Sequence, residues 1–195
     1  MLRWLCALAA LLCSSCLSAS ESPRHQLAFD RAETEAPGDI EISSPAFSEG
    51  ELIPFRYSAY GDGISPPLDW SGVPENAESL ILMVEDPDAV SVRPYLHWVV
   101  WNIDPAVRTL PENLQPGPQE GALATIVQGR NTRKKQGYFG PRPRGRKPHR
   151  YYFQLFALDT RLALDPKANR SAVVAALKGH VLAKGQLLGL FAKTD

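Results

Sequence analysis

The sequence predicts a predominantly β protein with one folded domain, and three observations lead to this fold class. Apolar segments of strand length recur along the chain, most clearly at 79–84, 97–103 and 151–158. Such runs are typical of buried strands when turn residues bound them, and here 17 Pro and 14 Gly residues supply the turns and loops. Only one stretch, from 169 to 181, has the apolar spacing of an amphipathic helix.

Four weaker segments complete the expected strands. Residues 39–43 alternate between polar and apolar, as a half-buried strand does, and 123–127 is short and apolar. Residues 52–57 are a further candidate, although Pro54 favours a strand edge or a strand start. Residues 185–192 are expected to form the last strand.

The expected helix has a start signal and an apolar stripe. Asn169 or Ser171 can cap its N-terminus. Its apolar residues recur at spacings of about three to four, and they are Val173, Val174, Leu177 and Val181. This helix lies close to the C-terminal end of the chain.

The first residues are expected to be a secretory signal rather than part of the fold. Residues 4–12 form an apolar stretch that is too short to span a bilayer, and small residues follow it up to Ala19. Cleavage after Ala19 and lipidation at Cys16 are alternatives. We therefore expect an exported protein, either periplasmic or anchored to the envelope, with a polar lead-in at 20–38 and one domain at 39–195.

All three cysteines, at positions 6, 13 and 16, lie in this leader. The domain therefore has no disulfide although its expected compartment allows one. It also has no thiol nucleophile and no thiolate with which to bind zinc. We expect no cofactor and no metal site.

The charge of the chain is balanced, with 21 basic and 21 acidic residues, but it is unevenly distributed. Residues 121–158 contain nine Lys and Arg and no Asp or Glu. Part of this block, expected as the basic rim of a site, comprises Arg142, Arg144, Arg146 and Lys147. A solvated face, an attraction for anions and contact with an anionic membrane surface are alternatives; nucleic acid is not expected, because interleaved aromatic residues are missing.

Two segments place polar side chains at the ends of expected strands. Asp86 and Asp88 flank Pro87 after one strand, and His97 begins the next. The second segment runs from Gly140 through Pro148, His149, Arg150 and Tyr151 into a third strand. Loops on a rigid scaffold commonly carry binding residues, although each residue taken alone also fits an ordinary role in a turn or a strand.

Together these segments resemble the motifs of the phosphatidylethanolamine-binding protein family, also called the Raf kinase inhibitor protein family, in its bacterial branch. The first motif corresponds to 80–102 and the second to 140–158, and the likeness extends over about 39–193. The resemblance implies a large central β-sheet packed on a smaller sheet, with a C-terminal helix. It also implies an anion pocket lined by Asp86, Asp88, His97, Gly140, His149 and Tyr151.

Elementary chemistry suggests a role for each of these residues. Two carboxylates repel an anion, so we expect Asp86 and Asp88 to orient the imidazoles, and charged His97 and His149 to donate to the ligand. Tyr151 would be a neutral donor, and Gly140 would let the backbone approach the ligand. The chain departs from the family pattern at Val90, where the motif has Pro, and at Arg142 and Arg144 in the Pro-rich loop.

The expected function is therefore binding of a phosphate-type or other small anionic ligand, with inhibition of a partner enzyme such as a kinase or protease as an extension. Relatives also suggest a homodimer. The alternative is a low-turnover hydrolase or a metal-dependent enzyme that uses the Asp and His cluster. A non-enzymatic role is favoured because no serine or cysteine nucleophile accompanies the cluster and no HExxH spacing occurs.

Overall fold

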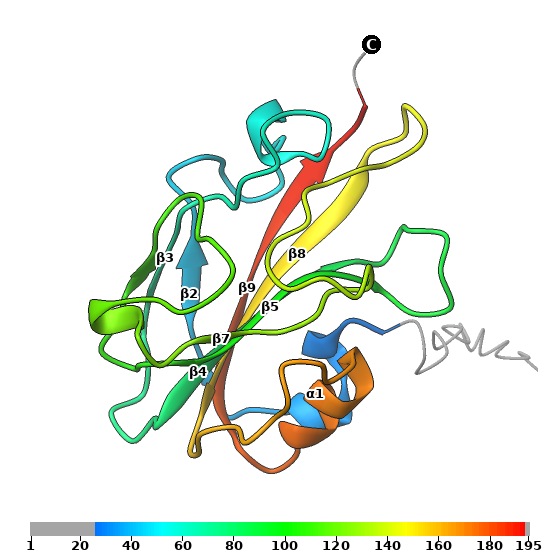
Figure 1. Cartoon of the computed structure of the whole chain (residues 1–195). Coiled ribbons are helices and arrows are strands. Elements are labelled where there is room, and N and C mark those ends of the chain that lie inside the picture. Colours follow the sequence, from blue (N-terminus) through cyan, green and yellow to red (C-terminus); the bar gives the residue numbers. More distant parts are fainter. Residues whose placement is uncertain (1–25, 194–195) are drawn as a thin grey trace, which may run out of the picture.

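The computed structural model describes residues 26–193 and shows two β-sheets packed face to face, as the sequence predicts (Figure 1). The larger sheet has six strands in the order β1-β9-β8-β4-β5-β7, and the smaller has three in the order β2-β3-β6. The strands are β1 (Gly38–Asp39), β2 (Glu41–Ser43), β3 (Leu68–Ser71), β4 (Ser79–Asp86), β5 (Tyr95–Ile103), β6 (Thr109–Leu110), β7 (Val127–Gln128), β8 (His149–Leu158) and β9 (Val181–Phe191). The helices are α1 (Arg170–Ala176) and the 3-10 turns η1 (Ala28–Asp30), η2 (Ala32–Thr34), η3 (Phe55–Tyr57) and η4 (Gly121–Leu123).

The larger sheet is covered on both faces. One face packs on the smaller sheet, and its core includes Trp98, Tyr151 and Phe153. The other face packs on α1 and the first described residues, around Ile81 and Phe156. The continuous apolar run in β4 follows from this arrangement, because all eight of its residues are buried.

Several expected elements differ in the structure. The segment 39–43 is split at Ile40, whose amide bonds to Lys184, so that β1 joins the larger sheet and β2 the smaller. Residues 52–57 are not a strand: Leu52 makes an isolated bridge, and the 3-10 turn η3 begins after Pro54. The segment 123–127 contributes only its last residue to β7, since η4 occupies its start.

The helix is confirmed but is shorter than expected. The Asn169 side chain caps it by accepting from the Ala172 amide at 3.0 Å. The helix ends at Ala176, and Val181 belongs to β9, because Gly179 adopts a positive φ that turns the chain. None of the described helices is long and apolar enough to cross a membrane.

The polar lead-in, which the sequence placed outside the domain, packs on the fold over its described part, residues 26–38. Ala28 is fully buried, and its amide donates to the Glu85 carboxylate at 2.8 Å. The Phe29 amide donates to the side chain of Gln154 at 2.7 Å. Residues 26–38 therefore cover the larger sheet, whereas the predicted signal and Cys16 lie outside the described residues.

The antiparallel pairing of β4 brings the two sequence segments together. β4 pairs with β8 so that Glu85 lies opposite Tyr152, and with β5 so that Asp86 lies opposite Tyr95. The end of β4 consequently lies between the starts of β5 and β8, because neighbouring antiparallel strands run in opposite directions. Residues some sixty positions apart in the chain meet at this edge.

Gly185 allows the chain before β2 to pass close to β9. A Cβ at Gly185 would lie 1.9 Å from the Ile40 carbonyl oxygen. We expect Gly185→Ala to lower the free energy of unfolding by about 2–3 kcal/mol, because the backbone must move apart. Gly145→Ala is the control, since no atom lies within 4 Å of its Cβ position; chemical denaturation measures both, and equal stabilities would contradict this account.

Candidate functional site

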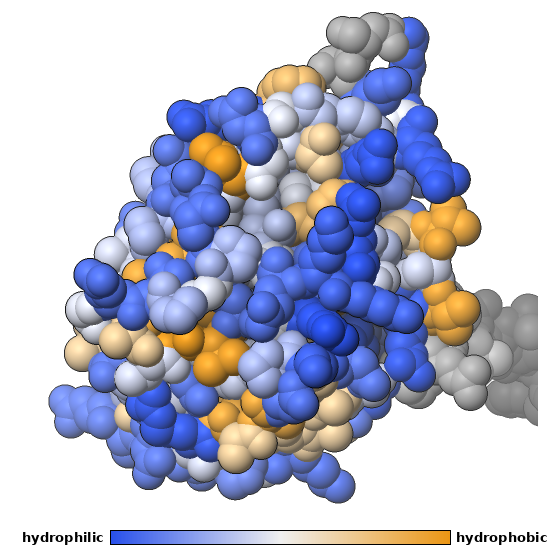
Figure 2. Space-filling model, in the orientation of Figure 1, coloured by the Kyte–Doolittle hydropathy of each residue, from blue (hydrophilic) through white to orange (hydrophobic). Residues whose placement is uncertain are grey.

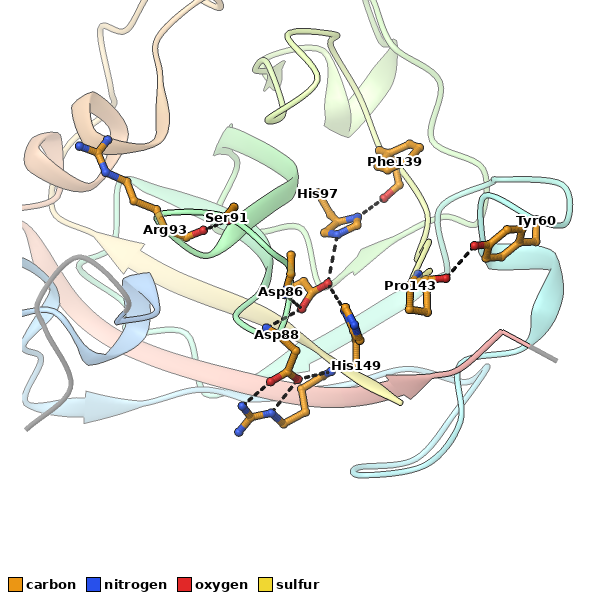
Figure 3. Close-up of polar contacts among 11 residues, drawn as sticks. Tyr60, Asp86, Asp88, Ser91, Arg93, His97, Phe139, Pro143 and His149 are labelled. Atoms are coloured by element: carbon orange, nitrogen blue, oxygen red, sulfur yellow. Dashed lines mark hydrogen bonds and ion pairs between the residues drawn. The ribbon is translucent and has the colours of Figure 1, made fainter. Parts of the chain in front are cut away.

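The Asp86 carboxylate is the centre of the polar cluster at the end of β4 (Figure 3). Its Oδ1 accepts from the amides of Asp88 and Ala89 at 2.8 and 3.0 Å, which closes the turn after Pro87. Its Oδ2 lies 2.9 Å from His149 Nδ1. Asp86 is 3% exposed, so these contacts replace the water that a buried carboxylate loses.

His149 is oriented by Asp86, as the sequence predicts. Because a carboxylate oxygen accepts, Nδ1 of His149 must carry the proton in this contact. Nε2 is then the nitrogen left for a ligand, and the side chain is 19% exposed. Protonation of the ring turns Nε2 into a donor, whereas the neutral ring offers only a lone pair there.

His97 is held differently, and the expectation of a charged donor at this position is wrong for the protein at neutral pH. Its Nδ1 donates to the Phe139 carbonyl oxygen at 2.6 Å, and its ring stacks on Phe139 with centroids 5.5 Å apart. Burial lowers the pKa of His97 to about 4, although Phe139 and Asp86 oppose the shift. The ring is therefore neutral at pH 7, and its Nε2 atom carries a lone pair that can accept a hydrogen bond. Nε2 lies 4.0 Å from Asp86 Oδ2.

Asp88 does not orient an imidazole. Its carboxylate binds Arg150 bidentately, with Nε to Oδ2 at 2.9 Å and Nη2 to Oδ1 at 2.7 Å. The Arg150 amide also donates to Oδ2 at 2.9 Å. The hydrogen bond from the Arg150 side chain holds the pKa of Asp88 below its usual value, so this pair fastens the turn to the start of β8.

Tyr151 places a hydroxyl with no partner beside this cluster. The residue is 1% exposed, and within the described structure its oxygen has no hydrogen-bond partner. Its ring meets His97 edge-on, with centroids 5.1 Å apart. Burial raises the pKa of Tyr151 most and the nearby Asp86 charge adds to it, while the Arg142 amide partly offsets both. Neither Asp86 nor Arg142 has the geometry of a hydrogen bond to the hydroxyl, which therefore remains a neutral donor.

Gly140 packs closely on the backbone of η3, and its expected approach to a ligand stays a prediction. A Cβ at this position would lie 2.4 Å from the Tyr57 carbonyl oxygen. The next residue, Pro141, accepts a hydrogen bond from the Ala59 amide at 3.0 Å. Glycine thus lets the Phe139 segment lie between η3 and His97.

The expected basic rim lies on the loop that enters β8. All four of its side chains are exposed: Arg142, Arg144, Arg146 and Lys147. The same loop is fixed to η3 by Tyr60, whose hydroxyl donates to the Pro143 carbonyl at 2.7 Å. Across residues 26–193, no group of three or more His, Cys, Asp or Glu side chains is arranged to hold a metal ion.

Sequence reasoning missed the residues that control His97. The Phe139 carbonyl accepts from its Nδ1, and the Phe139 ring stacks on the imidazole. The Arg133 guanidinium carbon lies 4.5 Å from the centroid of the same Phe139 ring, within the range of a cation–π contact. Tyr95 also contacts the imidazole, with centroids 4.9 Å apart. Only the aromatic character of Phe139, ahead of the glycine-proline step, could have indicated this contact from the sequence.

The fold and the site define a class of protein: a two-sheet β protein whose polar cluster lies where one inner strand ends and its two neighbours begin. Comparison with known families agrees, because the family model for phosphatidylethanolamine-binding protein matches residues 43–192. The chain belongs to the phosphatidylethanolamine-binding protein family, as the sequence motifs indicated.

Bacterial and archaeal members are among its relatives. A UPF0098 protein of Methanothermobacter thermautotrophicus is 44% identical over 153 residues, which cover 78% of this chain and 98% of that protein. The solved structure of CT736 from Chlamydia trachomatis, described as a putative family homologue, is 40% identical with a TM-score of 0.71 and covers 80% of this chain and 99% of that chain. E. coli YbcL is 29% identical with a TM-score of 0.72 and covers 80% of this chain and 100% of that chain.

The neutral state of His97 predicts a specific dependence of stability on pH. The unfolded chain takes up a proton near pH 6.5, whereas the folded chain resists it until about pH 4. His97 therefore contributes its full stability above pH 6.5 and loses it as the pH falls, by about 3 kcal/mol in total.

We expect His97→Gln to make the unfolding free energy less dependent on pH between 6.5 and 4. Urea denaturation at several pH values measures this difference. His180→Gln, which removes an exposed histidine paired with Asp159, controls for loss of an imidazole. A wild-type slope unchanged in the His97 variant would contradict a neutral buried ring.

Proposed function

We propose that this protein binds a small oxyanion that carries a proton, with phosphate as the type, at the cluster of Asp86, His97, His149 and Tyr151. The single observation that carries the proposal is the buried Tyr151 hydroxyl without a partner. A buried donor without an acceptor costs about 1–3 kcal/mol. A ligand oxygen at this point would remove that cost.

The cluster offers acceptors as well as donors. Tyr151 donates through its hydroxyl, and His149 donates through Nε2 when its ring is protonated. His97 Nε2 carries a lone pair, and Asp86 Oδ2 accepts on the same side. An anion without an O–H group would be repelled by these two acceptors, His97 Nε2 and Asp86 Oδ2. A phosphate that carries a proton can instead donate a hydrogen bond to one of them.

The Asp86 carboxylate would by itself repel an anion, and its existing hydrogen bonds reduce this repulsion. Asp86 is already bonded to His149 and to two amides, so part of its charge is compensated. The support for the proposal is the combination of donors and acceptors, and it favours phosphate over sulfate, which has no proton to donate at neutral pH.

The variant Tyr151→Phe distinguishes a role of the hydroxyl in phosphate binding from a role in protein stability. Removing a buried hydroxyl without a partner should leave the melting temperature unchanged or raise it. The same change should weaken inorganic phosphate binding by about tenfold, because one hydrogen bond to an anion is lost. Calorimetric titration with phosphate and thermal unfolding of the same sample give the two readings.

Tyr138→Phe is the matched control. Its hydroxyl donates to the Tyr57 carbonyl at 3.0 Å, so this variant should lose stability and keep its phosphate affinity. If Tyr151→Phe binds phosphate as the wild type does, the proposed site is wrong.

Phosphate affinity should fall as the pH rises from 5 to 8. The cause is that phosphate loses, over this range, the proton that it would donate to the acceptors of the cluster. Chemical-shift titration of the histidine ring protons with phosphate at three pH values measures the trend. An affinity that is constant across this range would contradict these roles.

Export to the envelope, pairing as a homodimer and inhibition of a partner enzyme are extensions of this proposal that rest on the leader sequence and on the resemblance. The alternative is turnover of the bound phosphoester by the Asp86–His149 pair, which has a donor–acceptor geometry suited to proton transfer. Assay of a generic phosphoester with wild type and His149→Ala distinguishes the two: turnover that His149→Ala abolishes indicates an enzyme.

A further inference from the structure

A groove lies apart from the Asp86 cluster, on the side of the molecule that carries α1. Its volume is about 690 Å³, and it lies between the loop after β4, the turn at 130–134 and the segment before α1. A second hollow of about 350 Å³ shares three of its lining residues, Arg130, Lys134 and Lys167. We call the two together the basic groove.

The basic groove has an excess of uncompensated positive charge. Five cationic side chains line it: Arg93, Arg130, Lys134, Lys167 and Arg170. Arg170 is neutralised by the buried Glu85 carboxylate, at 3.2 Å from Nη2 to Oε2. Over residues 26–193, the other four form no ion pair with a carboxylate, and Asp165 is the only acid that lines either hollow.

The turn that carries Lys134 is shaped by its neighbours. Asn131 Oδ1 accepts from the amides of Arg133 and Lys135 at 2.9 and 3.3 Å. Lys134 has a φ of 61°, a left-handed conformation that is uncommon for a residue other than glycine. The turn is tied to the other wall of the groove, because the Arg130 amide donates to the Pro166 carbonyl at 3.0 Å.

Two exposed valines stand beside these cations. Val90 and Val92, on the loop after β4, are 108% and 70% exposed, and Val92 and Arg93 also line the groove. Figure 2 shows hydrophobic side chains that protrude from the molecule at this loop, next to a strongly hydrophilic area. The loop is tied to α1, because Arg93 Nη1 donates to Ser171 Oγ at 2.7 Å.

The described chain begins at the same place. The Gln26 carbonyl accepts from Arg170 Nη2 at 2.8 Å, so the first described residue lies beside the basic groove. Only residues 17–25 separate Gln26 from Cys16, where lipidation is one of the two alternatives for the leader. Nine residues span about 30 Å at most, so a lipid at Cys16 would keep this face close to a membrane.

We propose that the face formed by the basic groove, Val90 and Val92 docks on a membrane surface that contains anionic phospholipids. The cations would contact lipid phosphates, and the two valines would enter the headgroup region. The two exposed valines favour a membrane over a soluble anion as the ligand of this face, because a soluble anion would contact only the cations and leave the valines in water. This proposal is independent of the Asp86 cluster.

Co-sedimentation with lipid vesicles tests the proposal, using a chain from Ser20 onward that keeps every described residue and carries no lipid. Vesicles of phosphatidylcholine with phosphatidylglycerol should bind the protein, and vesicles of pure phosphatidylcholine should not. Added salt should weaken the binding, because it screens the charges.

Two double variants test the two halves of the surface. Arg93→Gln with Lys134→Gln should lower vesicle binding by more than tenfold, at about fivefold for each cation. Val90→Ser with Val92→Ser should lower it by about tenfold without changing the melting temperature, since both side chains are exposed.

Arg108→Gln with Arg161→Gln is the charge-matched control, since both side chains are exposed and neither lines the basic groove. It should retain binding to within about twofold. An equal loss in this control would show attraction by net charge alone and would overturn the proposal. Binding that the valine variant retains, and that millimolar inorganic phosphate abolishes, would identify a soluble-anion site and would also overturn it.

Tyr151→Phe separates this proposal from the proposed function. It should keep full vesicle binding while it loses phosphate affinity. A groove variant that binds phosphate normally but fails on vesicles shows that the two sites are independent, whereas loss of both in one variant would contradict the separation.

Discussion

The end of β4 places two adjacent carboxylates in the interior, and each must be compensated because a buried unpaired charge is strongly destabilising. Glu85 is fully buried and Asp86 is 3% exposed. Since successive side chains of a strand point to opposite faces, the two carboxylates organise different sides of the sheet. Glu85 binds Arg170, Gln154 and the Ala28 amide, which attaches α1 and the first described residues. Asp86 binds His149 and the turn after Pro87.

This pair of carboxylates links fold to function. Arg170 compensates Glu85 and at the same time forms part of one wall of the basic groove, next to the point where the described chain begins. At the same end of the sheet, the ion pair of Asp88 with Arg150 fixes the turn after Pro87 to the first residues of β8. The polar cluster is therefore rigid before any ligand binds, and a preorganised site loses less entropy on binding.

The chemistry of the cluster depends on where each imidazole meets its partner. His97 is surrounded by Phe139, Tyr95 and Tyr151, and this apolar environment keeps it neutral. His149 remains partly exposed and faces the carboxylate. Two residues of one type thus acquire different roles, an acceptor and a potential donor, which suits a ligand that carries both an O–H and negative oxygens.

The sequence by itself determined the β class, the strands that carry the site and the family, because strand-length apolar runs and the Asp86–Ala89 and His149–Tyr151 motifs are local patterns. The tertiary structure decided what those patterns could not contain. The pairing of Asp88 with Arg150, the burial of the His97 ring against Phe139 and Tyr151, and the close packing of Gly140 on Tyr57 all involve residues more than forty positions away in the chain. The basic groove likewise combines Arg93, Arg130 and Lys167 from three separate segments. Charge state and partner choice follow from burial and distance, and only the folded chain sets these two quantities.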